Sequence, residues 1–414
     1  RWTGYPQFFK DQDWNDMLIG NGNMQNYNVN ISGGGERYSY MLSLGHQREE
    51  GIPKFGEDVN KRYFVRAKSS VEIFKNLTYD LNLAYEASNR DYSSGLTEGQ
   101  NIWEQLQIPC INILMDHPFI HKKALDEAPS NAVVICPDRN HMKFVQRFYP
   151  QIQIVGFLPH GGKTKNIQAK PIVERNIDIL YAGGISYKFI EQSKPDFKEF
   201  TFDAENIADE AYEELIKHPY RTTEEVIEEK LIESGINLSD NELLDVIEKL
   251  HYVDMLAVSY YREKTIKTLV EAGLKVTLYG TGWEVCEWIN NKNLDYRGRV
   301  SADEIVDLMY DSKIVLNTMT WFKDGTHDRV FNGMLAKAVA VTDSSIYMEE
   351  NFTADELVMF ELEDIDKLPQ IISGLLSDTD KMQQLADAGY DKAVQYHSWE
   401  KRADELYYDL ISQL

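Results

Sequence analysis

The hydrophobic period of this sequence changes near Gly95, and that change constrains the fold more than any other feature. Before it, apolar and polar residues alternate one by one over long runs such as Tyr27–Ile31 and Leu77–Tyr85. Such alternation places the apolar side chains on one face of a β-strand. After it, short apolar runs alternate with helical stretches, which predicts βα units and parallel sheets. We therefore expect an α/β fold preceded by an antiparallel β segment over residues 1–95.

The N-terminal segment predicts long strands joined by tight turns. Gly33–Gly35 and Phe74–Asn76 are the expected hairpin turns, since glycine and asparagine suit such positions. Tyrosine-rich strands of this length that are polar on their other face fit a large antiparallel barrel whose outside meets lipid. A soluble β-sandwich uses the same alternation, so the period alone does not decide between the two.

Seven apolar runs after residue 96 are candidate strands: Cys110–Met115, Ala132–Cys136, Gln153–Phe157, Ile177–Ala182, Lys275–Tyr279, Ile314–Thr318 and Val339–Thr342. Their order predicts a partial first Rossmann-like domain over 96–168. A second such domain would cover 169–414, with a helical insertion at about 188–250. Three capping boxes mark helix starts, at Thr222/Glu225, Ser239/Glu242 and Ser301/Glu304.

The composition excludes several classes of protein. The 414-residue chain has a net charge of −24, which would repel the phosphates of a nucleic acid. Three scattered cysteines are too few for a disulfide framework or a zinc cluster. No apolar run approaches the roughly 18 residues of a membrane-spanning helix. We expect no nucleic-acid partner and no metal site.

Glycines follow two of the candidate strands directly. Gly183 and Gly184 come after the fourth run, and Gly280 and Gly282 come after the fifth. Glycine lets the backbone approach a ligand and leaves N–H groups free for an anion. A plain tight turn is the alternative. Neither pair completes a Walker loop or a G-x-G-x-x-G fingerprint, so the ATPase and NAD-binding classes lack their motif.

The densest polar cluster is Lys323–Gly333, which follows the sixth run and enters a helix at about His327. A helix N-terminus favours a phosphate, and Arg329 can add a bidentate contact to it. Asp328 or Asn332 can bond a sugar hydroxyl. The alternative is a helix cap with a surface ion pair.

Histidines at two earlier strand exits are candidate general bases. Asp116 and His117 follow the first run, and His160 follows the third. A histidine beside an aspartate can accept a proton in catalysis. A structural role is the alternative for both histidines, and His141 is a weaker third candidate.

The motifs of the second half resemble those of a known family. Its C-terminal part resembles the C-terminal domain of GT-B glycosyltransferases, in the group-1-like branch with CgeB-type tails. The residues that carry this likeness are Ile314–Asn317, Gly325–Asn332, Ala338–Asp343 and Trp399–Ala403. Tyr296–Ser301 is similar to the family's strand and turn near the nucleotide base. Asn101–Trp103, Asp116–Pro118 and Leu158–His160 look like the family's first domain.

The resemblance implies a glycosyltransferase that needs no cofactor or metal, takes its sugar from a nucleotide-diphosphate donor and passes it to a glycan, lipid or protein. The residues themselves, rather than the resemblance, predict a catalytic group of Asp116, His117 and His160. The implied donor-binding residues are Gly183, Gly184, Gly280, Gly282, Arg299, Val300, Asp324, Gly325, Thr326, His327, Asp328, Arg329 and Asn332. Where the retaining family carries two glutamates eight positions apart, this chain has Asp324 and Asn332. The first domain also looks truncated.

Residues 1–92 resemble part of SusC/RagA-type TonB-linked outer-membrane proteins, through short matches such as Met24–Val29 and Tyr38–Gly45. The resemblance implies about four strands of a larger barrel, which we interpret as a fused fragment. It would meet a membrane only as part of a complete barrel. We expect the transferase part in the bacterial cytoplasm or at the inner-membrane surface, in cell-envelope glycan synthesis. The alternatives are a fragment of a TonB-dependent transporter and a catalytically inactive sugar-nucleotide-binding protein.

Overall fold

The computed structural model describes residues 21–51, 57–75, 77–93, 103 and 110–410, which belong to two compact units. The first unit covers Arg1–Pro109 and the second Cys110–Leu414. The change of fold predicted near Gly95 therefore lies 14 residues before the boundary between the units. The predicted class, an α/β fold with parallel sheets preceded by antiparallel strands, is confirmed.

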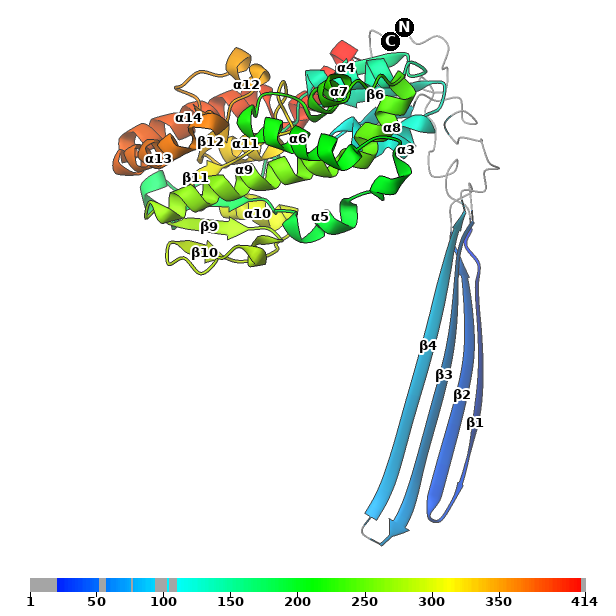
Figure 1. The fold of residues 1–414 in the computed structure, drawn as a ribbon. Helices are drawn as coiled ribbons and strands as arrows, with labels where there is room; N and C mark the ends of the chain where they lie inside the picture. The colour runs from blue at the N-terminus through cyan, green and yellow to red at the C-terminus, as the bar shows by residue number, and fades with distance from the viewer. Residues whose placement is uncertain (1–20, 52–56, 76, 94–102, 104–109, 411–414) are drawn as a thin grey trace. The chain divides into compact units, whose positions relative to one another are not determined.

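The first unit is a four-stranded antiparallel sheet of order β1-β2-β3-β4 (Figure 1). Its strands are β1 Met24–Gly35, β2 Tyr38–Glu50, β3 Glu57–Phe74 and β4 Leu77–Ser93. The first turn is Glu36–Arg37, and Gly33–Gly35 pair with Tyr38–Tyr40 inside the ladder. The prediction that the three glycines form the turn is therefore wrong. The second predicted turn is placed correctly, although Asn76 lies outside the described residues.

The predicted alternation in the first unit is confirmed by the register. Val29, Leu44, Val65 and Tyr85 pair in one row across all four strands. Each of these four side chains is exposed, and among the described residues of this unit Val59 is the only buried apolar one. The two-fold period thus fixes the strands and their register.

The second unit begins with a small parallel sheet of order β5-β6-β7. Its strands are β5 Cys110–Ile113, β6 Ala132–Cys136 and β7 Ile154–Phe157. The helices that accompany it are η2 Pro118–His121, α3 Lys122–Asp126 and α4 Arg139–Phe148. Asp138 caps α4 by accepting the N–H of Asn140 at 2.6 Å. The three early apolar runs therefore form strands as predicted.

The larger sheet of this unit has six parallel strands in the order β10-β9-β8-β11-β12-β13. They are β8 Ile177–Ala182, β9 Val276–Tyr279, β10 Leu294–Tyr296, β11 Ser312–Leu316, β12 Val339–Asp343 and β13 Val358–Phe360. The chain starts at the centre with β8, extends the sheet to one side and then returns to build the other side from β11. The strand order therefore reverses between β8 and β11. In open α/β sheets, that reversal leaves a crevice at the carboxyl ends of the two strands.

Helices fill the connections of the larger sheet and the chain beyond it. They are η3 Ile172–Glu174, α5 Tyr187–Ser193, η4 Phe197–Glu199, α6 Ala204–Lys217, α7 Thr223–Glu233, α8 Asp240–Leu250, α9 Tyr252–Glu271, η5 Trp283–Val285, α10 Ala302–Met309, α11 Asp328–Leu335, α12 Ile346–Asn351, η6 Leu362–Lys367, α13 Leu368–Ser377, α14 Thr379–Tyr396, α15 Trp399–Glu405 and η7 Leu406–Leu410. The capping boxes predicted at Ser239 and Ser301 form in full. At Thr222 the structure records the hydroxyl accepting the N–H of Glu225.

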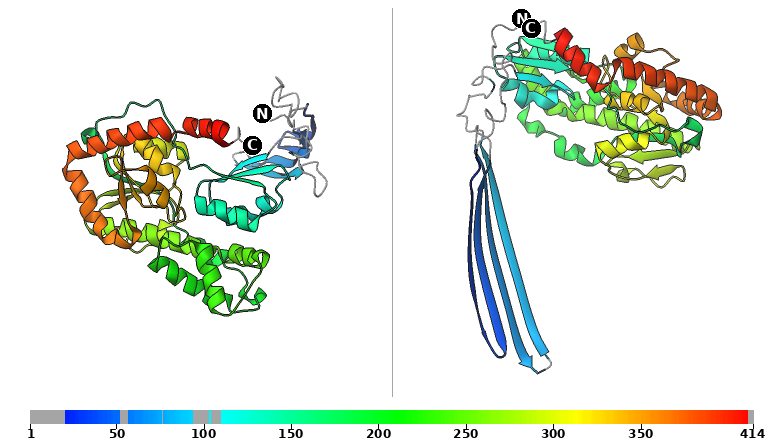
Figure 2. Two further views of the ribbon diagram at one scale, coloured as in Figure 1. Left: turned by 90° about the horizontal axis from the view of Figure 1, so that it is seen from above. Right: turned by 180° about the vertical axis from the view of Figure 1, so that it is seen from behind.

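The helical insertion, which spans α5 to α8, packs against the small sheet. Ile207, Val226 and Ile247 share one apolar cluster with Val134 of β6 and Phe144 of α4. At the other end of the chain, α15 also reaches the small sheet (Figure 2). Ser398 pairs with Gly162, and Arg402 Nε donates to the carbonyl of His160 at 3.0 Å. Both contacts tie the two sheets of the unit together.

We predict that Ile227→Ala lowers the free energy of unfolding by about 2–5 kcal/mol, because the side chain is fully buried in that cluster and its loss leaves a cavity. Ile232 lies on the same helix and is 57% exposed, so Ile232→Ala is the matched control. Denaturant unfolding of the full chain measures both variants. Equal losses would show that α7 does not bury this face.

Candidate functional site

The carboxyl ends of β8, β11 and β12 lie next to one another and carry a continuous polar network. Tyr181 of β8 bonds through its hydroxyl to Thr318 Oγ1 at 2.7 Å. Asn317, beside it, donates through Nδ2 to Thr342 Oγ1 at 2.9 Å. The next residue of β12, Asp343, accepts the N–H of Met319 at 2.8 Å. All of these polar side chains are buried, so each needs its partner.

Two arginines stand at this network. Arg329, in the first turn of α11, donates to Asn317 Oδ1 and lies 5.9 Å from the ring centre of Tyr181. Arg262, from α9, donates to the carbonyl of Gly184 at 2.6 Å and lies over the ring of Trp321. The two guanidinium groups are close enough that burial, and then the charge of Arg262, lowers the pKa of Arg329.

Neither arginine forms a salt bridge within the described part of the chain. Arg262 Nε is buried and has no hydrogen-bond partner there. Both side chains are half-buried, and a buried donor without a partner is costly unless a ligand accepts its hydrogen bond. The arrangement therefore suits a diphosphate at the β8–β11 reversal.

Sequence reasoning missed Arg262. It lies in the middle of a 20-residue helix, 78 residues after the glycine that it contacts, and no motif surrounds it. The only available signal was that α9 must pack behind β8 and so bring some of its polar side chains to the strand exit.

The glycine-rich strand exits pack against each other. Gly183 N–H donates to the carbonyl of Tyr279 at 2.9 Å, so the expectation that this N–H is free for an anion is wrong. A Cβ on Gly184 would lie 2.8 Å from the carbonyl oxygen of Thr281. Gly280 and Gly282 have φ values of +143° and +92°, which favour glycine. These four glycines therefore allow the two loops to pack closely, backbone against backbone, near the two arginines.

His327 is the N-cap residue of α11, and its Nδ1 lies 2.7 Å from Asp328 Oδ1. Burial, followed by the charge of Arg329, lowers the pKa of His327 to about 4. The imidazole is therefore uncharged at pH 7, and its Nδ1 accepts the N–H of Arg329 at 3.2 Å. The predicted helix start is confirmed, and the cap of the alternative interpretation is present beside Arg329.

His160 reaches the same helix start from the small sheet. Its Nδ1–H donates to the carbonyl of Thr326 at 2.7 Å, and its ring lies 6.0 Å from that of His327. Burial lowers the pKa of His160, while the charges of Asp328 and Asp116 act in the opposite direction. The structure thus brings Asp116 and His160 to the strand-exit edge.

His117 lies elsewhere, and this corrects the expectation that it joins His160. His117 Nε2 is 3.4 Å from Glu224 Oε2, and its ring stacks on Phe119 at 3.8 Å. Its ring also lies 4.4 Å from His141, and burial lowers the pKa of His117 to about 3. The two histidines line a cavity of about 10 Å³, the size of one water, beneath the helical insertion. His117 and His141 therefore have structural roles, which was the alternative to a role in catalysis.

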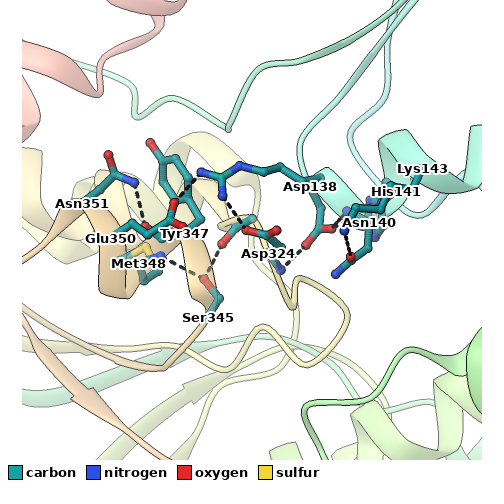
Figure 3. Close-up of polar contacts among 12 residues, drawn as sticks. Asp138, Asn140, His141, Lys143, Asp324, Ser345, Tyr347, Met348, Glu350 and Asn351 are labelled. Atoms are coloured by element: carbon teal, nitrogen blue, oxygen red, sulfur yellow. Dashed lines mark hydrogen bonds and ion pairs between the residues drawn. The ribbon is translucent and has the colours of Figure 1, made fainter. Parts of the chain in front are cut away.

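The loop before α11 closes against the small sheet. Asp138 accepts the N–H of Asp324 at 2.7 Å and pairs with Gly325 in a β-bridge, as Figure 3 shows for the two aspartates. Arg139 bonds both Asp324, at 3.2 Å, and Glu350, at 2.6 Å. Thr326 is fully buried. The structure therefore uses Asp324, Gly325 and Thr326 as a seam, in contrast to the expectation that they contact the donor.

Three other predicted donor residues lie on either side of the arginines. Asn332 uses both ends of its amide, since Oδ1 accepts the N–H of Lys163 at 2.7 Å and Nδ2 donates to Asp328 at 3.2 Å. Each end of that amide thus already has a partner within the chain. Arg299 is exposed after β10, and Val300 packs against the α10 cluster. A role of Arg299 and Val300 near a base stays a prediction.

Part of the second unit matches a known family. Residues 262–407 match the family model described as Glycosyl transferase-like, a range that begins at Arg262 and includes Arg329. No curated protein matches the sequence. The chain therefore carries a glycosyl transferase-like segment. The match does not reach residues 1–92, so their resemblance to SusC/RagA proteins gains no support from it.

Several solved structures are distantly similar. HepE of Anabaena, in complex with UDP and glucose, is 12% identical at a TM-score of 0.46, covering 75% of this chain and 73% of its own. TarM of S. aureus is 10% identical at a TM-score of 0.43, and the match covers 92% of this chain and 78% of TarM. Sucrose-phosphate synthase of Thermosynechococcus elongatus is 11% identical at a TM-score of 0.42, and the match covers 75% of this chain and 71% of the synthase. Likenesses this weak do not establish an activity for this chain.

We predict that Asp343 makes stability fall as pH rises. Burial raises the pKa of Asp343 to about 7, so the folded chain holds a proton that the unfolded chain loses near pH 4. Stability contributed by that proton is lost between about pH 4 and pH 7. Asp343→Asn keeps an acceptor for Met319 and removes the titration. The melting temperature of the variant, relative to the natural chain, should therefore rise across this range, and a constant difference would contradict the prediction.

Proposed function

We propose that the chain transfers a sugar from a nucleoside-diphosphate donor to a hydroxyl group of an acceptor. The observation that supports this most is the unpaired arginine pair at the strand reversal, inside the glycosyl transferase-like segment. Its charge fits a diphosphate, which is the leaving group of such a donor. The first turn of α11 adds the positive end of a helix dipole.

In the proposed reaction, the bond between the anomeric carbon and the diphosphate oxygen breaks, and the acceptor oxygen bonds to that carbon. The nucleoside diphosphate leaves with the electron pair, and the acceptor hydroxyl loses its proton. Negative charge therefore grows on the diphosphate in the transition state. Arg262 and Arg329 are already fixed by Gly184 and Asn317, so they can stabilise that charge with little rearrangement.

His160 is the proposed residue of the small sheet that faces the transferred sugar. It stays uncharged at neutral pH because burial lowers its pKa, and its Nδ1 is held by the carbonyl of Thr326. A neutral, oriented imidazole beside Asp116 can bond a sugar hydroxyl. We propose Arg299 and Val300 for the base, since their loop is tied to the Gly280 turn through Gly298.

The acceptor is proposed to be a glycan or a lipid-linked saccharide, with the transferase working in the cytoplasm or at the inner-membrane surface. None of the described helices is long and apolar enough to cross a bilayer.

We predict that UDP, GDP or ADP raises the melting temperature of the second unit. Arg329→Ala and Arg262→Ala should each weaken nucleotide binding by about 1.5–3 kcal/mol, the scale of a hydrogen bond to a charged group. Arg147 carries the same charge but is paired with Glu228 and Asp240, so Arg147→Ala is the control and should bind normally. If no nucleoside diphosphate moves the melting curve at millimolar concentration, the donor site is refuted.

We further predict that binding of the diphosphate needs no divalent cation, because the two arginines supply the positive charge. Among the described residues, no group of three His, Cys, Asp or Glu side chains is arranged to hold a metal ion. The nucleotide-dependent melting shift should keep its size in EDTA. A shift that appears only after Mg²⁺ or Mn²⁺ is added would contradict this prediction.

A further inference from the structure

A pocket of about 300 Å³ opens at the carboxyl ends of β11, β12 and β13, next to the arginine pair but separate from it. Its lining includes Met319, Asp343, Ser344 and Lys323. Ligands of open α/β sheets bind at this edge. The volume matches the lower end of small-molecule sites and would hold one or two sugar rings.

The helical insertion contributes two residues to the lining of the pocket. Pro219 and Tyr220 belong to the short connection between α6 and α7, and Lys323 Nζ donates to the carbonyl of Pro219. The connection is thereby fixed over the pocket. Tyr220 is 67% exposed and Ile346 on the opposite rim is 52% exposed. An exposed tyrosine ring at a pocket mouth suits the C–H face of a sugar ring.

The polar lining consists mainly of hydrogen-bond acceptors with negative charge. Glu349, Glu361 and Glu363 line the pocket, and Lys323 is the one cation in the lining. Ser344 Oγ donates to Glu361 Oε1 at 2.7 Å, which holds that carboxylate at the wall. No salt bridge of the described chain neutralises the three glutamates. Carboxylates accept hydrogen bonds from hydroxyl and ammonium groups and repel anions.

Asp343 connects this pocket to the proposed donor site. It lines the pocket, accepts the N–H of Met319, and follows Thr342, whose hydroxyl bonds Asn317. Asn317 in turn holds Arg329. The electrostatic influence of Asp343 also reaches Arg329 and Lys323. A ligand in the pocket would thus lie one layer of side chains from the diphosphate.

We propose that this pocket binds the acceptor as an uncharged or amino-bearing saccharide, with Tyr220 stacking on the ring and the glutamates bonding its hydroxyl or ammonium groups. That the bound saccharide is the acceptor of the reaction rests on the proposed function. That the pocket binds a saccharide does not depend on it. It assigns a specificity role to the helical insertion and disfavours acceptors that carry phosphate or carboxylate at this position.

The test measures binding of three p-nitrophenyl glycosides to the full chain in the presence of UDP, by ligand-observed NMR. The glucoside is neutral, the glucosaminide is cationic and the glucuronide is anionic. We expect the glucuronide to bind at least about tenfold more weakly than the other two, because of charge repulsion. The double variant Glu361→Gln/Glu363→Gln should reduce that difference to about threefold or less.

Tyr220→Ala should weaken binding of the glucoside at least about fivefold, the scale of one aromatic contact. Tyr407 is similarly exposed but lies in η7, outside the pocket, so Tyr407→Ala is the matched control and should bind like the natural chain. The melting shift by UDP alone, measured in parallel, reports on the donor site and so separates its failure from failure of the pocket. The proposal is overturned if the natural chain binds none of the three glycosides, if all three bind equally, or if Tyr220→Ala behaves like Tyr407→Ala.

Discussion

The reversal of strand order between β8 and β11 is the constraint on which the rest of the second unit depends. It brings the exits of β8, β11 and β12 together, and the chain fills that edge with buried polar side chains. Each buried group then needs a partner, which produces the continuous network from Tyr181 to Asp343. Although α11 packs on β11 and β12 and α9 on β9, Arg329 and Arg262 both reach this edge, where they bond Asn317 and Gly184.

The two halves of the second unit meet through several different kinds of contact. The helical insertion contributes apolar burial, the Asp138–Asp324 seam contributes hydrogen bonds, and α15 contributes Arg402, which binds the carbonyl of His160. These contacts fix the small sheet against the larger one. A histidine from one sheet can therefore face the helix start of the other with a defined orientation, as a transfer site requires.

The sequence predicted the elements better than the roles of the residues. Periodicity and capping boxes located the long strands and the starts of α8 and α10, whereas β10 and β13 were missed because three residues carry no period. The helix start at His327 was correct because its polar cluster is local. Arg262 and the seam at Asp324 depend on contacts between distant segments, which a single sequence does not display. Asn332 looked like a ribose ligand, yet its amide bonds Lys163 and Asp328.

The most direct test of the account is a crystal structure of the full chain with bound UDP. The account predicts the diphosphate at the β8–β11 exits, with its oxygens within hydrogen-bond distance, about 3 Å, of both Arg262 and Arg329. A diphosphate bound elsewhere on the chain, or one that contacts neither guanidinium group, would contradict the central claim.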